Sequence, residues 1–209
     1  MVMVKTCIFD MGGVLIREFQ IANPLMKFLG RSEEGFGQIG AEVREALRLH
    51  SCGLLDETEF WEIYCNVSGD FLPENRGSLL GRFFNPKLDI PTVRVVEDLK
   101  GKGMRVVCGT NVIDSHYRIH MEHGDYQIFD TVYASHLLGI CKPNPEFFHS
   151  ILEKEGLSPE EAFFTDDLEQ NVDVAAQIGI HAYLYVDSQS LRSQLASLGI
   201  LEDLRDNHV

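Results

Sequence analysis

The sequence predicts an α/β protein built on a doubly wound parallel sheet, with a helical segment inserted after the first strand. Short apolar runs rich in β-branched and aromatic residues alternate with longer segments of helical pattern, as in sheets whose strands are buried on both faces. Polar residues follow several of these runs, at the points where the strands should end. Ligands of open α/β sheets bind beside the carboxyl ends of the strands, so these polar residues are the candidates for a functional site.

Four strands are expected, at residues 4–9, 104–108, 162–165 and 181–186, and a weaker fifth at residues 129–134. Between them, Asn144 is placed to cap a helix that has Pro145 at its first position and Gly156 at its end. Ser158 and Glu161 have the spacing of a capping box before a short turn.

The first and second strands are separated by an unusually long segment. From residue 15 to about residue 90 we find no convincing strand, only helical pattern at residues 24–29, 42–49, 56–64 and 79–84. Such a segment is too long for one crossover helix, and we therefore predict a core of residues 1–16 and 86–209 with a helical domain of residues 17–85. Phe60, Trp61 and Tyr64 have helical spacing and should form the core of that domain.

The composition is that of a globular chain, with 209 residues of which 44% are hydrophobic. With 18 Lys and Arg against 32 Asp and Glu, the net charge of -14 disfavours nucleic acid and anionic membranes as partners. No stretch approaches the roughly 20 apolar residues that span a bilayer, and the first residues lack the pattern of a signal peptide. We therefore expect a cytoplasmic protein without a membrane partner.

The cysteines number five and form no CxxC pair, which argues against a disulfide framework and against a structural zinc site. Cys7 and Cys108 lie within apolar strand-like runs and are expected to be buried thiols.

The polar residues at the expected strand ends form an anionic set with one lysine: Asp10, Thr110, Asn111, Lys142, Asp166, Asp167 and Asn171. Carboxylates that converge at one edge repel one another unless a cation is present, and oxygen ligands with few protein groups suit Mg²⁺ together with a substrate phosphate. Lys142 can balance a carboxylate and a phosphoryl oxygen, and Thr110 can donate a hydrogen bond to another. Asp10 is then placed to act as a nucleophile that forms an aspartyl-phosphate.

Four segments with these residues resemble, in order, the motifs of the haloacid dehalogenase superfamily, whose members are mostly Mg²⁺-dependent phosphatases. They are residues 9–15, 106–111, 139–145 and 163–167, the last followed by Asn171. The resemblance implies that Asp10 is the nucleophile, that Thr110 and Lys142 bind the phosphoryl group, and that Asn111 binds phosphate or orients the nucleophile. It also implies a metal site of Asp10, the backbone carbonyl of Gly12, Asp166 and Asp167.

The helical insertion resembles the small cap domain of one large subgroup of this family. In that subgroup the cap closes over the site and selects the substrate. On this basis Arg17, Glu18 and His50 could reach the organic part of a substrate.

Gly12 is a departure from the family pattern, because most phosphatases of the family carry an acid/base aspartate at this position. Three explanations remain open: His116 or Asp114 supplies the proton, the substrate has a good leaving group such as a sugar anomeric phosphate, or catalysis is weak. Helical patterning makes a solvated or hydrogen-bonded face an equally good interpretation of His116, His120 and His123.

The leading hypothesis is a Mg²⁺-dependent phosphatase that acts on a small phosphorylated metabolite, in particular a sugar phosphate. A haloacid dehalogenase is an alternative that fits Gly12 but not the Asp166–Asp167 pair. A phosphate-ligand binder with weak turnover is the third hypothesis, and only Gly12 favours it.

Overall fold

A five-stranded parallel sheet forms the centre of the molecule in the computed structural model, which describes residues 2–32, 35–73 and 77–202. The order of the strands is β5-β4-β1-β6-β7, and all four pairings are parallel. The strands are β1 (Thr6–Phe9), β4 (Arg105–Thr110), β5 (Thr131–Ala134), β6 (Ala162–Asp166) and β7 (His181–Leu184). The predicted fold class is confirmed, and each of the five expected strands is present with its ends shifted by a few residues.

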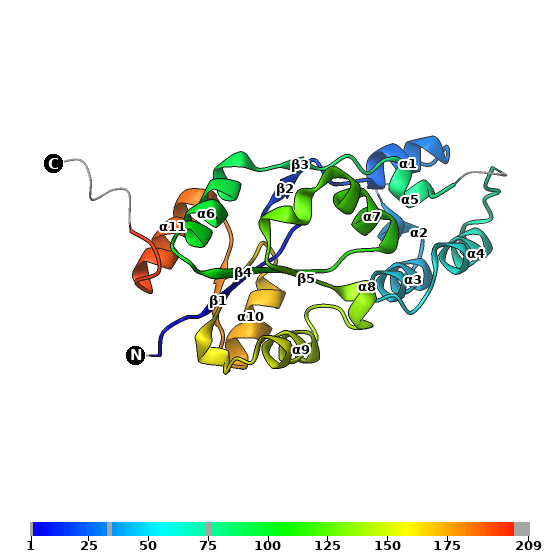
Figure 1. Ribbon diagram of the computed structural model, residues 1–209. Coiled ribbons are helices and arrows are strands. Elements are labelled where there is room, and N and C mark those ends of the chain that lie inside the picture. The colour runs from blue at the N-terminus through cyan, green and yellow to red at the C-terminus, as the bar shows by residue number, and fades with distance from the viewer. Residues whose placement is uncertain (1, 33–34, 74–76, 203–209) are drawn as a thin grey trace.

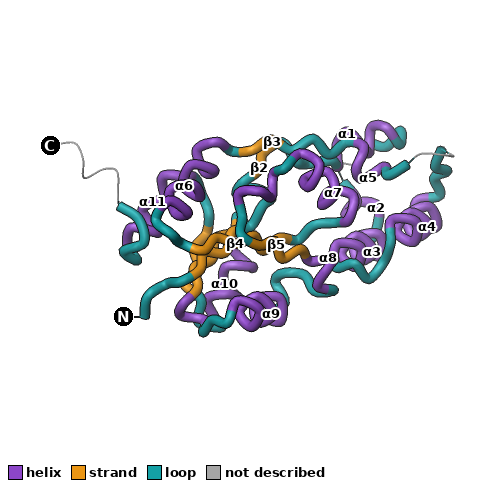
Figure 2. The backbone as a smooth tube through the Cα atoms, viewed as in Figure 1, coloured by secondary structure: helices purple, strands orange, loops and turns teal. Residues whose placement is uncertain are grey.

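Helices cover both faces of this sheet (Figure 1). α6 (Ile90–Gly101) and α11 (Ser188–Ser197) pack on one face, and α9 (Pro145–Glu155) and α10 (Glu169–Gln177) pack on the other, so that the strands lie in the middle layer (Figure 2). Alternate residues of β1 enter the two cores, since Phe9 belongs to the first cluster and Ile8 to the second. Cys7 and Cys108 are buried thiols, as predicted.

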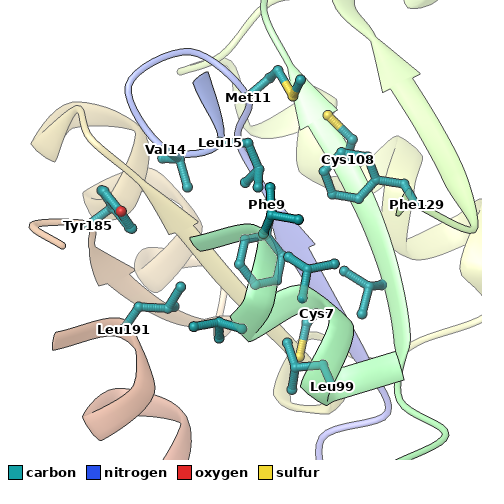
Figure 3. Close-up of a cluster of buried hydrophobic side chains, with 14 of the residues drawn as sticks. Cys7, Phe9, Met11, Val14, Leu15, Leu99, Cys108, Phe129, Tyr185 and Leu191 are labelled. Atoms are coloured by element: carbon teal, nitrogen blue, oxygen red, sulfur yellow. The ribbon is translucent and has the colours of Figure 1, made fainter. Parts of the chain in front are cut away.

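The chain that follows β1 is anchored in the first of these cores. Met11, Val14 and Leu15 are fully buried and point into the cluster that also holds Phe9 and Leu99 (Figure 3). This packing fixes the loop that carries the residues directly after Asp10.

The local helix signals hold in the structure. The Asn144 side chain accepts a hydrogen bond of 3.0 Å from the backbone N–H of Glu146, and Gly156 ends α9 in the left-handed conformation. The predicted capping box of Ser158 and Glu161 is present and encloses the short 3₁₀ helix η2 (Pro159–Glu161), and Asp56 and Glu59 form a second capping box.

Along the chain, five described helices follow β1 and precede α6, and we call this group the helical insert. In space it lies beyond one end of the sheet (Figure 1). The helices are α1 (Ala22–Phe28), α2 (Phe36–Ile39), α3 (Ala41–Ser51), α4 (Glu57–Ser68) and α5 (Leu79–Arg82). They share a hydrophobic cluster in which Phe60, Trp61 and Tyr64 are fully buried. The remaining elements, α7 (Asp114–His123), η1 (Asp125–Ile128) and α8 (Ser135–Leu138), belong to the chain after β4.

The two chain segments that enter and leave the helical insert pair with each other. β2 (Ile16–Arg17) and β3 (Lys87–Leu88) form an antiparallel two-stranded sheet. The expectation that this region contains no strand is therefore wrong. Strands of two residues are too short to produce an alternating pattern that the sequence would reveal.

A disulfide joins the helical insert to the core, because Cys52 at the end of α3 is bonded to Cys141. The prediction against disulfides is wrong at this pair. The two cysteines are 89 residues apart, and only the folded arrangement brings them together. Next to this bond the Ser135 hydroxyl donates to the carbonyl of Ser51 over 2.5 Å, so the end of α3 is held to the core at two points.

Among the described residues, no helix has both the length and the apolar character of a membrane span.

Replacing Cys52 with Ser should lower the free energy of unfolding by about 2–4 kcal/mol, because the unfolded chain loses a cross-link over a long loop. Denaturant unfolding with and without reductant measures this difference. Reductant should destabilise the wild type to the level of Cys52→Ser and leave the variant unchanged. Equal stability of the oxidised wild type and the variant would contradict the expectation.

Candidate active site

A lysine between two carboxylates is the centre of the site. The Lys142 ammonium donates hydrogen bonds of 2.6 Å to Asp10 Oδ1 and of 2.6 Å to Asp166 Oδ2. All three residues are buried, with Asp166 completely excluded from solvent. Charge-assisted hydrogen bonds of this kind are short and directional, so Lys142 fixes the orientation of both carboxylates.

The sheet topology places these groups together. Asp10 directly follows β1, and Asp166 is the last residue of β6, the neighbouring parallel strand. Thr110 ends β4 on the other side of β1 and is also buried. Since all three strands run in the same direction, the predicted residues Asp10, Thr110 and Asp166 lie at one edge of the sheet.

Asn111 fixes the backbone of the loop that contains Lys142 through two hydrogen bonds. Its side-chain amide donates to the Lys142 carbonyl over 2.9 Å and its side-chain oxygen accepts from the Lys142 backbone N–H, also over 2.9 Å. In the structure the Asn111 side chain contacts the Lys142 backbone, and its contact with a phosphate or with Asp10 stays a prediction. Asn111 is a positioning residue for the lysine.

Asp166 is held as firmly as Lys142. Its Oδ1 accepts hydrogen bonds from the backbone N–H of Leu168 over 2.9 Å and from the Asn171 amide over 3.0 Å. Asn171 is itself buried on the first turn of α10. The position of Asn171 after the paired aspartates therefore has a structural reason.

Two carboxyl groups of the site, those of Asp10 and Asp167, have raised pKa values. Burial raises the pKa of Asp10 to about 7, because it outweighs the opposing effect of the Lys142 charge, and the nearby Asp166 charge adds to the rise. Burial and the Asp166 charge also raise the pKa of Asp167. Burial alone would lower the pKa of Lys142, but the two carboxylates it contacts raise it, so the lysine stays charged.

A divalent cation fits this set of donors. Asp10, Asp166 and Asp167 each offer a carboxylate oxygen, and these atoms lie within 4.8 Å of one another. A bound cation would reduce the repulsion that raises the pKa values of Asp10 and Asp167. The loop after Asp10, which contains Gly12 and Gly13, approaches this cluster closely.

Gly13 is required for that approach. It has a φ of 76°, and a Cβ atom at this position would lie only 2.1 Å from Asp167 Oδ2. The sequence shows Gly13 inside the first motif, but only the structure shows that its missing side chain makes room for Asp167.

Neither His116 nor Asp114, the two residues predicted to supply a proton in place of an aspartate at position 12, is placed to donate one. The Nε2 of His116 is 3.1 Å from the Leu80 carbonyl, its ring stacks on Phe84 at 3.7 Å, and burial lowers its pKa to about 4. His116 is therefore neutral near pH 7. Asp114 pairs with Arg118 over 2.9 Å on α7, and both side chains are exposed.

Three residues expected to reach the substrate make other contacts. Arg17 donates to the Gly13 carbonyl and, over 3.1 Å, to the Tyr185 hydroxyl. Glu18 pairs with Lys87 over 2.5 Å, and His50 Nδ1 lies 2.9 Å from a backbone carbonyl within the insert. In this arrangement the three side chains are engaged within the protein, and their contact with a substrate stays a prediction.

The Arg17 contacts belong to a network that the sequence does not reveal. The Tyr185 hydroxyl lies 2.6 Å from Thr92 Oγ1, which donates to Asp89 over 2.5 Å. Asp89 is also 3.6 Å from the Arg17 guanidinium. This network joins the connecting strands, the core and the loop after Asp10, and its members are too far apart in the chain to form a motif.

The haloacid dehalogenase-like hydrolase family model matches residues 4–179, so the chain belongs to this family of hydrolases. Sesquiterpene phosphatase from Aspergillus oryzae is 26% identical over 93% of this chain and 96% of its own length. Acyl-CoA dehydrogenase family member 10 from Mus musculus is 37% identical over 42% of this chain, and the match spans 8% of that protein. A haloacid dehalogenase family enzyme from Bacteroides thetaiotaomicron, solved with magnesium and inorganic phosphate, is 25% identical with a TM-score of 0.67, covering 88% of this chain and 94% of its own.

Replacing Gly13 with Ala should lower hydrolase turnover at least about tenfold, because Asp167 must move away from the new Cβ. Gly156→Ala is a matched control, since Gly156 has a similar φ of 67° but nothing within 4 Å of the added atom. Both variants should lose about 1–3 kcal/mol of stability from backbone strain. Turnover and denaturant unfolding of both variants separate the two effects. Equal losses of turnover would show that strain alone is responsible.

Replacing Lys142 with Met should destabilise the protein by about 3–5 kcal/mol at pH 8, because it leaves buried carboxylates without a counter-charge. The loss should be smaller at pH 5.5. Without the lysine the pKa of folded Asp10 rises further above its unfolded value, so stability falls as the pH rises through the folded pKa.

Denaturant unfolding at both pH values tests this dependence, with Lys154→Met, which removes an exposed lysine of α9, as the control. The control should lose little at either pH. A loss for Lys142→Met that is the same at pH 5.5 and pH 8 would contradict the electrostatic role.

Proposed function

We propose that this chain is a Mg²⁺-dependent phosphatase that hydrolyses a small phosphorylated metabolite through an aspartyl-phosphate on Asp10. The observation that carries the proposal is the buried Lys142 ammonium between Asp10 and Asp166, beside a third carboxylate from Asp167. The similarity to a sesquiterpene phosphatase, and to a family enzyme solved with magnesium and inorganic phosphate, supports phosphate chemistry for this chain.

The residues that would hold Mg²⁺ are Asp10, Asp166 and Asp167, with the backbone carbonyl of Gly12. When bound, Mg²⁺ supplies positive charge that stabilises the phosphoryl oxygens and lowers the repulsion among the carboxylates. The all-carboxylate set within 4.8 Å suits a hard cation that prefers oxygen ligands.

The protein groups then act on the substrate as follows. The Asp10 carboxylate attacks phosphorus as the bond from phosphorus to the ester oxygen breaks, and the organic group leaves with that oxygen. Lys142 fixes the orientation of Asp10 and offsets charge on the phosphoryl oxygens. Thr110 donates its hydroxyl to a phosphoryl oxygen, and Asn111 keeps the Lys142 loop in place. Water attacks the phosphorus of the aspartyl-phosphate, which releases inorganic phosphate and restores Asp10.

The helical insert takes the role of a cap over this site, with domain limits of 17–85 for the cap and 1–16 with 86–209 for the core. The paired strands β2 and β3 at its base support this division, and so does the hydrophobic cluster of the insert, which includes only Ile113 from the core among its buried described residues. A sugar phosphate, which the sequence predicts as the substrate, stays a prediction.

Asp10→Asn should abolish Mg²⁺-dependent phosphate release, because the amide cannot form the phosphorylated intermediate. Asp173→Asn, which changes an exposed aspartate of α10, should retain it. The measurement is phosphate release from a panel of phosphorylated metabolites and p-nitrophenyl phosphate, in Mg²⁺ and in chelator.

Unchanged turnover in chelator would contradict the proposal. Chloride release from a 2-haloacid without Mg²⁺ would support a dehalogenase instead. Binding of phosphorylated ligands without release of phosphate would support a non-catalytic binder.

A further inference from the structure

The space beside Gly12 is bounded by an aromatic ring. A Cβ atom at Gly12 would lie 3.4 to 3.8 Å from three ring carbons of Phe19. Phe19 belongs to the segment between β2 and α1 and packs against the core cluster. Where a side chain two residues after the nucleophile would project, the structure therefore offers an apolar surface and no acid.

Phe19 also borders a cavity between the helical insert and the core. The cavity has a volume of about 460 Å³ and reaches Asn111, directly after the phosphate-site residue Thr110. Its walls include Phe36 and Leu47 from the insert and Ile113 from the core. A phosphate ester bound at Asp10 would place its organic part in this cavity.

Most polar side chains in the cavity wall already have protein partners. Asn111 pairs with the Lys142 backbone, and the Ser51 hydroxyl donates to a backbone carbonyl over 2.8 Å. Arg48 donates to both carboxylate oxygens of Glu45. Of the described polar residues in this wall, Gln20 and Arg44 are left for a ligand, which is few for a molecule with many hydroxyl groups.

The cavity wall also lacks a suitable proton donor among the residues that the structure describes. Its ionisable side chains are Arg44, Arg48 and His116. Arginine does not give up its proton in proteins, and His116 directs Nε2 at the Leu80 carbonyl. None of these three side chains is placed to protonate a leaving oxygen in this cavity, and without a donor the oxygen departs with its negative charge.

We propose that the substrate is a phosphate ester of an apolar, acidic hydroxyl compound of the phenol type, an inference that rests on the proposed function. The Asp10 oxygen forms a bond to phosphorus as the bond from phosphorus to the aryl oxygen breaks, and its electron pair goes to the aryloxide. Solvent protonates the aryloxide, and a water molecule hydrolyses the aspartyl-phosphate. Ester and water thus give phenol and inorganic phosphate.

The test is kcat/KM of the wild-type protein in Mg²⁺ for a series of substituted phenyl phosphates, hexyl phosphate and glucose 1-phosphate. This ratio reports the step that breaks the bond to the leaving group. We expect it to fall steeply as the pKa of the leaving hydroxyl rises, with the hexyl and glucose esters at least about 100-fold below phenyl phosphate, the usual scale of missing acid catalysis.

Phosphate release at similar rates from the hexyl, glucose and phenyl esters would overturn this inference and leave the proposed function standing. Absence of release from every ester, p-nitrophenyl phosphate included, would overturn the proposed function itself.

Two substitutions at Gly12 test whether the lack of an acid at this position causes the dependence of kcat/KM on the leaving group. Gly12 is not among the described residues with positive φ, so it can accept a side chain. Gly12→Asp should raise kcat/KM for hexyl phosphate at least about tenfold relative to phenyl phosphate, because it adds a proton donor. Gly12→Asn, which has the same shape without the acid, should keep the steep dependence. An unchanged dependence in an active Gly12→Asp would overturn the assignment, and the wild-type series decides the question if neither variant folds.

Discussion

The hydrogen bonds of the Lys142 ammonium to Asp10 and Asp166 are the interaction on which the rest of the site depends. Two carboxylates cannot stay charged and buried beside each other unless a positive charge lies between them. The surrounding structure serves this arrangement: Asn111 holds the backbone of Lys142, and Asn171 holds Asp166. Even so, the pKa of Asp10 stays raised. A divalent cation bound beside it would stabilise the charged carboxylate.

Two of the contacts between the helical insert and the core lie close to catalytic candidates. At its base, Arg17 connects the paired strands to the Gly13 carbonyl in the loop after Asp10. At the end of α3, the Cys52–Cys141 disulfide reaches the residue directly before Lys142. The cavity between these contacts is therefore bounded by parts of the chain that also position Asp10 and Lys142.

The sequence predicts what depends on local chemistry. Buried strands, the capping boxes at Asp56 and Ser158, and the charged residues at strand ends follow from short segments, and the structure contains them. The Cys52–Cys141 bond, the Arg17 network and the Phe19 ring beside Gly12 depend on segments that meet only in three dimensions. The sequence also contains no information on the direction of the Arg17 and His50 side chains, so it could not predict the contacts that they make in the structure.

Trapping the aspartyl-phosphate tests the role of Asp10 directly. Wild-type protein is mixed with Mg²⁺ and p-nitrophenyl phosphate, quenched in acid during turnover, and digested for mass spectrometry. If Asp10 is the nucleophile, a peptide carries the mass of one added phosphoryl group at Asp10, and the corresponding peptide of Asp10→Asn does not. Phosphate release with no modified Asp10, or with the phosphoryl group on another residue, would contradict it.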